Sequence, residues 1–256
     1  MTDFAPAPGA APLRKLVAAQ AGLELRTLVR NGEQLLLTLV IPVLLLVVFS
    51  AEALINIGPG RRIDFIAPGI LALAVMSTSF TSLAIGTAFE RRYGVLKRLG
   101  STPLSRSGLI GAKAATVLMV ELGQAVLIIV VGLLLGWQPV VSVVSIGSSV
   151  LVLLAGSAAF SGLAMLMAGT LRAEATLAAA NLVYLVLLGV GGVIFPIAKF
   201  PASVRPALRL LPSGAMSDGL RSVLRFGVGL PARDLLVLTA WAIVGLALAA
   251  RTFRWE

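Results

Sequence analysis

The residue types that could do chemistry in this chain are few. It contains neither cysteine nor histidine. This excludes Cys/His zinc sites, haem held by histidine, cysteine nucleophiles, Ser–His–Asp triads and disulfides. The sequence also lacks the G-x-x-x-x-G-K-[ST] loop that cradles nucleotide phosphates and the G-x-S-x-G nucleophile elbow. We therefore expect no catalytic residue, metal site or cofactor in this chain, and we predict that it is not an enzyme.

Two polar residues stand within an otherwise apolar stretch. Glu121 and Gln124 are one helical turn apart. An ionisable group at membrane depth is by default a candidate functional residue. Glu121 could pair with a polar group on another helix, relay protons or contact a transported molecule. It could equally be a hydrogen-bonded residue that faces the helix bundle, and the sequence leaves these alternatives open.

Further polar side chains lie in two other apolar runs. Residues 77–82 contain five hydroxyl-bearing side chains around Phe80, with Thr81 next to it, and Asn181 and Tyr184 share one helix face by their spacing. Such residues could line a path through the membrane. Small hydroxylated side chains are also favoured where membrane helices pack together, so both functions remain possible for each residue.

The composition shows which elements must position these residues. The chain is 58% hydrophobic and 12% charged, with a mean hydropathy of +1.00. Soluble domains carry about 25% charged residues, so this chain has too little polar surface for a water-soluble globule. A net charge of +10 would suggest a nucleic-acid partner in a soluble protein. Here the basic residues fall between apolar runs and set topology, so we expect no nucleic acid.

Charge-free runs long enough to cross the bilayer, about 20 residues each, predict six transmembrane helices. Their expected ranges are 34–52, 65–89, 110–135, 140–170, 175–196 and 233–250. With the long segment after the fifth span left aside, basic residues number 13 on one side of the membrane and 2 on the other. The positive-inside rule then places both termini in the cytoplasm of a cell-membrane protein.

Two segments flank this arrangement at the N-terminus. Residues 1–12 are rich in Pro and Ala, and we expect them to be disordered. Residues 13–31 show helical spacing with an apolar stripe, which predicts a helix lying in the cytoplasmic interface against membrane lipids. The stripe is imperfect because Arg14 and Glu24 fall close to it.

Two further segments are not spans. The charged stretch 90–107 contains a short apolar edge, and Gly94 permits a turn before it. Ser105 or Ser107 could cap the helix that follows. A short charged helix at the cytoplasmic face suits docking to a soluble partner. A basic loop that only fixes the membrane topology has the same composition, so the residues alone leave both interpretations open. Four prolines interrupt the chain between Phe200 and Ala232, three of them within residues 200–230, so no span fits there.

Both segments resemble a known family. The first is similar to the signature of ABC-2 type permeases, the membrane subunits of ABC exporters, and most of all to the drug- and antibiotic-export branch of the daunorubicin-resistance type. The residues that carry the likeness are Glu90, Gly94, Leu96, Leu99, Pro103, Leu104 and Ser105. The Phe-Pro and Leu-Pro pattern from Gly191 to Leu224 resembles the family's external hairpin. One departure is the run Tyr93-Gly94-Val95, where the family more usually has Glu/Arg-Gly-Thr.

The resemblance implies an all-α polytopic membrane protein. It would have six transmembrane helices, an N-terminal interfacial helix and an external re-entrant helical hairpin between spans 5 and 6. It implies two copies of a cytoplasmic ATPase subunit, which bind ATP and Mg, and a second permease in a homodimer or heterodimer. The implied contacts with the ATPase are Glu90, Arg91, Gly94, Leu96, Leu99, Pro103 and Leu104. The implied substrate pathway between spans 2 and 5 includes Phe80, Thr81, Asn181, Tyr184 and Phe195.

The expected function is ATP-driven efflux of a hydrophobic or amphipathic small molecule such as a drug, antibiotic or lipid, with antibiotic resistance as one outcome. An exporter of polysaccharide or lipid-linked glycan is an alternative, although aromatic residues, which favour sugar binding, make up only 6% of the chain. A proton-coupled secondary transporter would use Glu121 as its carrier. A membrane-embedded enzyme would need clustered ionisable groups at depth, and Glu121 stands alone there.

Overall fold

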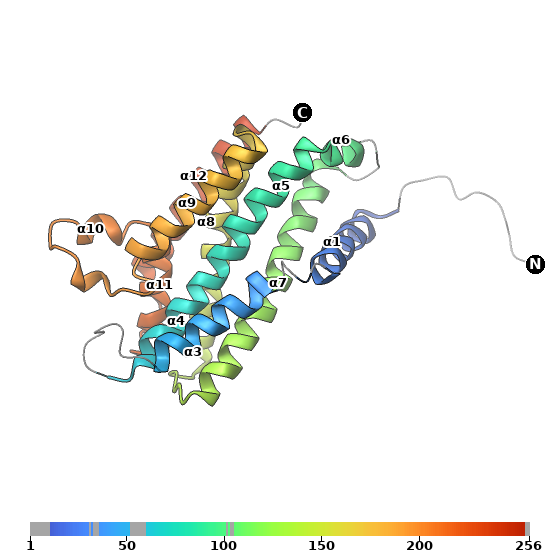
Figure 1. Ribbon diagram of the computed structural model, residues 1–256. Coiled ribbons are helices and arrows are strands. Elements are labelled where there is room, and N and C mark those ends of the chain that lie inside the picture. The colour runs from blue at the N-terminus through green and yellow to red at the C-terminus, as the bar shows by residue number, and fades with distance from the viewer. Residues whose placement is uncertain are drawn as a thin grey trace, which may run out of the picture.

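The computed structural model describes residues 11–30, 32, 36–51, 60–100, 102 and 105–253, and in this part of the chain every regular element is a helix (Figure 1). Five helices are long and apolar enough to cross a bilayer. They are the continuous helix Arg62–Arg92, α7 (Arg106–Leu134), α8 (Val143–Thr170), α9 (Ala173–Val190) and α12 (Ala232–Thr252). The predicted all-α polytopic membrane fold is confirmed.

The first expected span, 34–52, is described only in part. The π-helical segment η1 (Leu36–Val40) continues as α3 (Ile41–Ala51), which packs against the continuous helix and α7. Residues 33–35 and 52–59 lie outside the described residues, as do residues 1–10 of the N-terminal segment. A count of six spans therefore stays a prediction.

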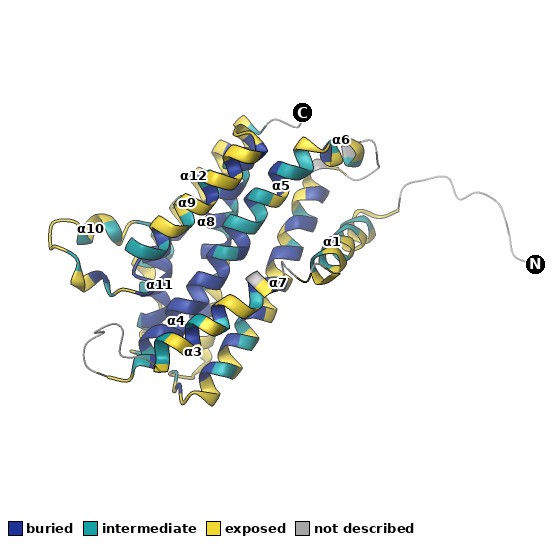
Figure 2. Cartoon of the chain, in the orientation of Figure 1, coloured by how far each residue is buried: buried dark blue, intermediate teal, exposed yellow. Residues whose placement is uncertain are grey.

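The second span forms the centre of the bundle. It consists of α4 (Arg62–Val75), the π-helical segment η2 (Met76–Ser82) and α5 (Leu83–Arg92). In its most apolar stretch 89% of the residues are buried, against 22% in α9 and α12 (Figure 2). The hydroxylated run coincides with the change to π geometry, and the Ser79 hydroxyl donates to the Val75 carbonyl at 2.6 Å. Hydroxyls that bond back to the preceding turn perturb a helix in this way.

Serine side chains cap the first turns of two helices around this centre, and a glycine allows two helices to pack closely. Ser105 caps α7 by accepting a hydrogen bond from the Gly108 amide at 3.1 Å, as the sequence predicted. Ser142 and Ser145 form a capping box at the start of α8. Close packing of α8 on α12 depends on Gly162, where an added Cβ would lie 2.9 Å from the Leu246 amide nitrogen.

The fifth span is shorter than predicted. We expected it to reach residue 196, but α9 ends at Val190 because Gly191 and Gly192 turn the chain there, the latter with φ +71°. The chain then forms the 3-10 turn η3 (Ile197–Lys199), α10 (Arg205–Leu208) and α11 (Pro212–Leu224). The helix α11 is buried against α4, α8 and α12 at one end of the bundle (Figure 1).

The N-terminal helix α1 (Leu13–Arg30) agrees with the predicted range and packs on α7. At the contact, Ala21 is buried, and the Thr116 hydroxyl lies 3.5 Å from its carbonyl oxygen. The short helix α6 (Val95–Gly100) follows α5 at the end of the bundle opposite α10 and α11 (Figure 1). We refer to these two ends as the α6 end and the hairpin end.

Candidate coupling site

The α6 end is built around a turn between two helices. α5 ends at Arg92, Gly94 has φ +69°, and α6 begins at Val95, so the second span leads directly into the short helix. Leu96 is buried and Leu99 is half-buried, which fixes one face of α6 against its own chain. The side chains that point to the surface are Tyr93, Val95, Lys97 and Arg98. Pro103 and Leu104 lie outside the described residues.

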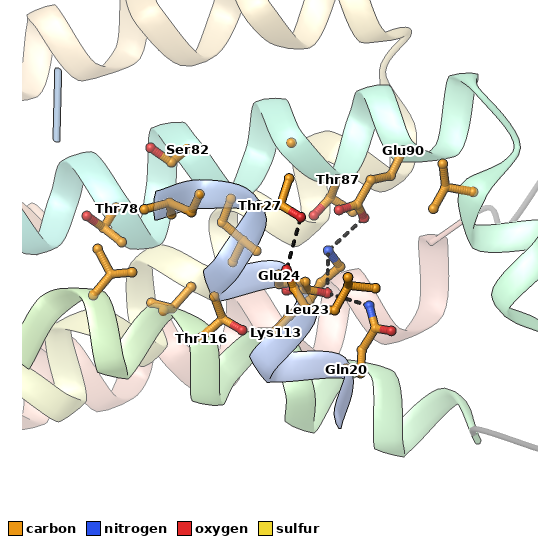
Figure 3. Close-up of a pocket in the computed structure, with 16 residues that line it drawn as sticks. Gln20, Leu23, Glu24, Thr27, Thr78, Ser82, Thr87, Glu90, Lys113 and Thr116 are labelled. Carbon is orange, nitrogen blue, oxygen red and sulfur yellow. Dashed lines mark hydrogen bonds and ion pairs between the residues drawn. The ribbon is translucent and has the colours of Figure 1, made fainter. Parts of the chain in front are cut away.

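A buried lysine links this turn to two other helices. The Nζ atom of Lys113, on α7, lies 2.6 Å from a carboxylate oxygen of Glu90 and 3.6 Å from one of Glu24 on α1. Gln20 donates a further hydrogen bond to Glu24 at 3.0 Å. Figure 3 shows these side chains converging from three helices. Only 7% of the Lys113 side chain is exposed, so solvent screens these pairs less than surface pairs.

These charged groups border a cavity of about 310 Å³ between α1, the second span and α7 (Figure 3). The two carboxylates and one ammonium give its charged lining a formal charge of −1. The remaining wall is a mixture of hydroxylated and aliphatic side chains, including Thr87, Thr116 and Val117. The cavity lies between α1 and α5. The ion pairs of Lys113 therefore connect α1 to the turn.

Two arginines connect the same turn to the loop between α8 and α9. Arg91 donates to the carbonyl oxygen of Leu171, and Arg92 pairs with Glu174 at the start of α9. The guanidinium of Arg92 also lies 5.8 Å from the centre of the Tyr93 ring. A force on α6 would therefore reach α1, α7 and α9 through side-chain contacts, in addition to the helix that continues into the second span.

Comparison with known families decides what kind of protein carries this turn. A family model described as ABC-2 family transporter protein matches residues 61–251, which include the second span, the α6 turn and the hairpin. The chain belongs to this family. No curated protein matches it. The chain is thus a membrane permease subunit of an ABC transporter, in a family whose members generally lack an ATPase motif of their own and work with an ATPase subunit.

In this ABC-2 permease, the intramembrane Gln124 has a clear structural role. It is almost fully buried on α7 and accepts a hydrogen bond from the Thr78 hydroxyl at 2.9 Å. Its amide nitrogen donates to the Thr38 carbonyl oxygen at 2.7 Å. Thr38 lies in η1 and Thr78 in η2, so one side chain joins the π-helical segments of two spans.

Glu121, one turn earlier on α7, is also buried, but its hydrogen bonding is incomplete. Its nearest hydrogen-bonding side chains are Ser157 on α8 and Ser79 in η2. One carboxyl oxygen, Oε1, is buried and has no hydrogen-bond partner. Within the described ranges Glu121 has no salt bridge.

The five residues predicted to line a substrate pathway occupy different environments. Phe80 is in the core, with its ring tilted against Phe160 at 6.3 Å between centroids. Tyr184 reaches Ser77 and so connects spans 5 and 2. Asn181 is exposed and donates back to the Leu177 carbonyl at 2.9 Å. The other two are the half-buried Thr81 and the exposed Phe195. Phe80 could reach a pathway only if η2 and α8 separated.

The sequence interpretation missed Arg221, which holds the hairpin end together. This residue was counted only as one of several external basic residues. Its Nε donates to the Phe65 carbonyl at 3.1 Å, and its guanidinium carbon lies 3.7 Å from the centre of the Phe65 ring. Its terminal nitrogens donate to the carbonyls of Gly192 at 2.5 Å and Val193 at 2.7 Å. Burial lowers the pKa of Arg221 to about 9, opposed by the charge of Asp218, so the guanidinium remains charged at neutral pH.

Proposed function

We propose that this permease works with a separate cytoplasmic ATPase to export a hydrophobic or amphipathic small molecule, such as a drug, antibiotic or lipid. In the active unit two permeases, identical or different, and two ATPase subunits would assemble in the cell membrane, with ATP and Mg bound by the ATPases. The observation that carries this proposal is the α6 turn: the end of α5, which leads directly into α6, contacts α7 and, through Lys113, α1, and it contacts the start of α9.

The surface of α6 fits a protein partner. Tyr93 is 64% exposed and lies beside exposed Lys97 and Arg98. Aromatic and basic side chains are enriched at protein interfaces, where arginine and tyrosine often act as anchors. The opposite face of α6, with Leu96, is packed on its own chain and keeps this surface in place. In this proposal Glu90, Arg91 and Leu96 position the surface, and the ATPase contacts the exposed residues.

The orientation follows from the distribution of charge. Basic residues cluster at the α6 end and in the connected N-terminal and C-terminal segments, and the positive-inside rule makes this end cytoplasmic. The hairpin end then faces outward. Its six basic residues do not oppose this orientation, because longer packed segments are less governed by charge during translocation.

The mechanism uses these connections in sequence. ATP binding draws the two ATPases together, and their motion displaces α6 in each permease. The Lys113 contacts then carry the displacement to α1 and α7, while the Arg92 contact carries it to α9. The spans would rock between inward-facing and outward-facing states, so that the cargo path opens to one side at a time.

The experiment compares two matched charge reversals in the full-length permease, coexpressed with its ATPase. Lys97→Glu changes the exposed face of α6, and Lys199→Glu changes an exposed lysine at the hairpin end. We expect Lys97→Glu to weaken copurification of the ATPase and export strongly, while Lys199→Glu leaves both intact. Equal behaviour of the two variants would refute the assignment. Export that needs no ATPase but requires Glu121 would instead support the proton-coupled alternative.

A further inference from the structure

A second cavity lies within the membrane-spanning part of the molecule, away from the α6 turn. It has a volume of about 240 Å³ and is formed by α4, α7 and α8. Its lining consists of Leu71, Ala74, Val75, Leu118, Glu121, Leu122, Ala125, Val150, Leu153 and Leu154. Glu121 is thus the one polar side chain in an otherwise aliphatic wall.

The cavity opens on the outer surface of α7 and α8, two helices that are apolar and long enough to cross a bilayer. Four of its lining residues are exposed apolar side chains on the outer surfaces of α7 and α8, namely Leu118, Leu122, Val150 and Leu154. A molecule dissolved in the membrane could reach the cavity between these side chains without crossing an aqueous compartment. The inner wall, by contrast, is formed by the buried residues Leu71 and Ala74 of the central helix.

Glu121 sits at the back of this cavity with incomplete hydrogen bonding. The Ser79 hydroxyl near it already donates to the Val75 carbonyl at 2.6 Å, so this hydroxyl has no second proton to give. Carboxyl Oε1 is buried without a partner, and within the described part of the chain no cation pairs with the group. Burying a carboxyl group in an apolar medium without a hydrogen-bond donor costs free energy. A donor that reaches the group would offset this cost.

We propose that this cavity binds the amine-bearing end of a lipophilic amine taken from the membrane, with the ammonium group paired to Glu121. An ammonium supplies the charge-assisted hydrogen bonds that a carboxylate accepts most strongly. The aliphatic wall would accommodate the adjoining alkyl carbons. At about 240 Å³ the cavity is smaller than typical drug-sized sites of roughly 300–1,000 Å³, so it suits an elongated amphiphile rather than a bulky ring system.

This proposal does not depend on the ATPase or on export. The cavity shares no lining residue with the cavity beside Lys113, and binding can be measured on the full-length permease alone. A variant that loses amine binding but still copurifies with the ATPase would separate the two proposals.

The test uses the permease reconstituted in phosphatidylcholine nanodiscs, with radiolabelled dodecylamine as probe and dodecanol as its uncharged counterpart. Scintillation proximity measures binding, and empty nanodiscs give the background. We expect saturable binding of one dodecylamine per chain. Glu121→Gln, which keeps the shape and the contacts to serine, should weaken amine binding roughly tenfold or more, and dodecanol should bind weakly to both proteins.

Two tryptophan substitutions on α8 keep the test decisive if Glu121→Gln fails to fold. Leu154→Trp fills the cavity and should abolish amine binding, whereas Ile146→Trp, on an exposed position outside the cavity, should leave it unchanged. Unchanged amine binding in Glu121→Gln or in Leu154→Trp would overturn the proposal. So would dodecanol binding as tight as dodecylamine binding, or no saturable binding above empty nanodiscs.

Discussion

The two ends of this permease use basic side chains in different ways. At the hairpin end, Arg221 is buried and donates to three backbone carbonyls. Two of them, those of Gly192 and Val193, lie in irregular chain after α9, where a helix supplies no donor. At the α6 end, Lys113 and Arg92 pair with carboxylates. The Lys113–Glu90 pair is mostly buried, whereas the side chains of Arg92 and Glu174 are at least half exposed. Backbone carbonyls cannot leave the hairpin, whereas carboxylates on separate helices can exchange partners. We therefore predict that the hairpin end is rigid and that the α6 end moves.

The largest effect should come from breaking the rigid end. Arg221→Leu removes every donor from the carbonyls of Gly192 and Val193 and leaves them buried. Each buried carbonyl left without its donor costs about 1–3 kcal/mol, so the two together cost about 2–6 kcal/mol. We expect the variant to be poorly expressed or aggregated, as measured by size-exclusion profile and thermal unfolding in detergent. Arg221→Lys should not rescue it, because one ammonium lacks the planar fork that reaches three carbonyls.

The matched control for that loss is Arg209→Leu. Arg209 is on the same hairpin, but 46% of its side chain is exposed and its carboxylate contact is long, at 3.9 Å. An exposed pair contributes only about 0–1 kcal/mol, so this variant should purify normally. If both arginine variants unfolded alike, the hairpin would depend on total positive charge and not on the Arg221 geometry.

The next effect concerns the movable end. Lys113→Met leaves Glu24 and Glu90 facing the same cavity with no cation between them. We expect a stability loss of about 1–3 kcal/mol and a larger loss of coupling, seen as ATPase activity that no longer depends on cargo. The double variant Glu24→Gln with Lys113→Met should recover stability but not coupling. Normal coupling in Lys113→Met would show that the Lys113 contacts do not transmit force from α6.

The sequence was enough to predict the parts of the fold that depend on local composition. The Gly94 turn follows from backbone preferences, and helices lie close to the expected ranges of the second, third, fourth and sixth spans. The sequence offered Ser105 and Ser107 as possible caps of α7, and the structure has Ser105 in that role. The α6 signature also identified the family correctly. These features depend on neighbouring residues in the chain, so one sequence is sufficient to recognise them.

Long-range pairing was beyond the sequence interpretation. Glu24 was read as a flaw in the apolar stripe of α1, but it lies on that face because Lys113 of α7 is its partner. Lys113 itself was counted only as a topological charge. Arg221 could have been suspected, since an arginine among small residues three positions after Asp218 is unusual in a segment expected to dip into the membrane. Its carbonyl acceptors, in contrast, are fixed only by the tertiary fold.

A smaller effect is expected between the two ends, at Gln124. Gln124→Leu removes its hydrogen bonds to Thr38 and Thr78 while keeping a similar volume. Interhelical hydrogen bonds in membranes contribute about 0.6 kcal/mol on average and rarely more than about 1.7, so we expect a modest decrease in unfolding temperature. Thr78→Val removes one of the two bonds and serves as the intermediate case. A collapse as severe as that of Arg221→Leu would mean that the π-helical junction, and not the hairpin, is the rigid point.

The smallest effect should come from the most exposed pair, Arg92 with Glu174, whose side chains are 50% and 60% exposed. Solvent and salt screen such a pair, so Arg92→Gln should change stability by less than about 1 kcal/mol. Its effect on transport should be small at physiological salt and greater at low salt, where the Arg92–Glu174 pair that the variant loses is least screened. Measuring export at two ionic strengths checks this, with Glu174→Gln as the reciprocal variant. A salt-independent loss of transport in both variants would show that this pair has a fixed structural role like that of Arg221. The difference between the two ends would then depend on Lys113 alone.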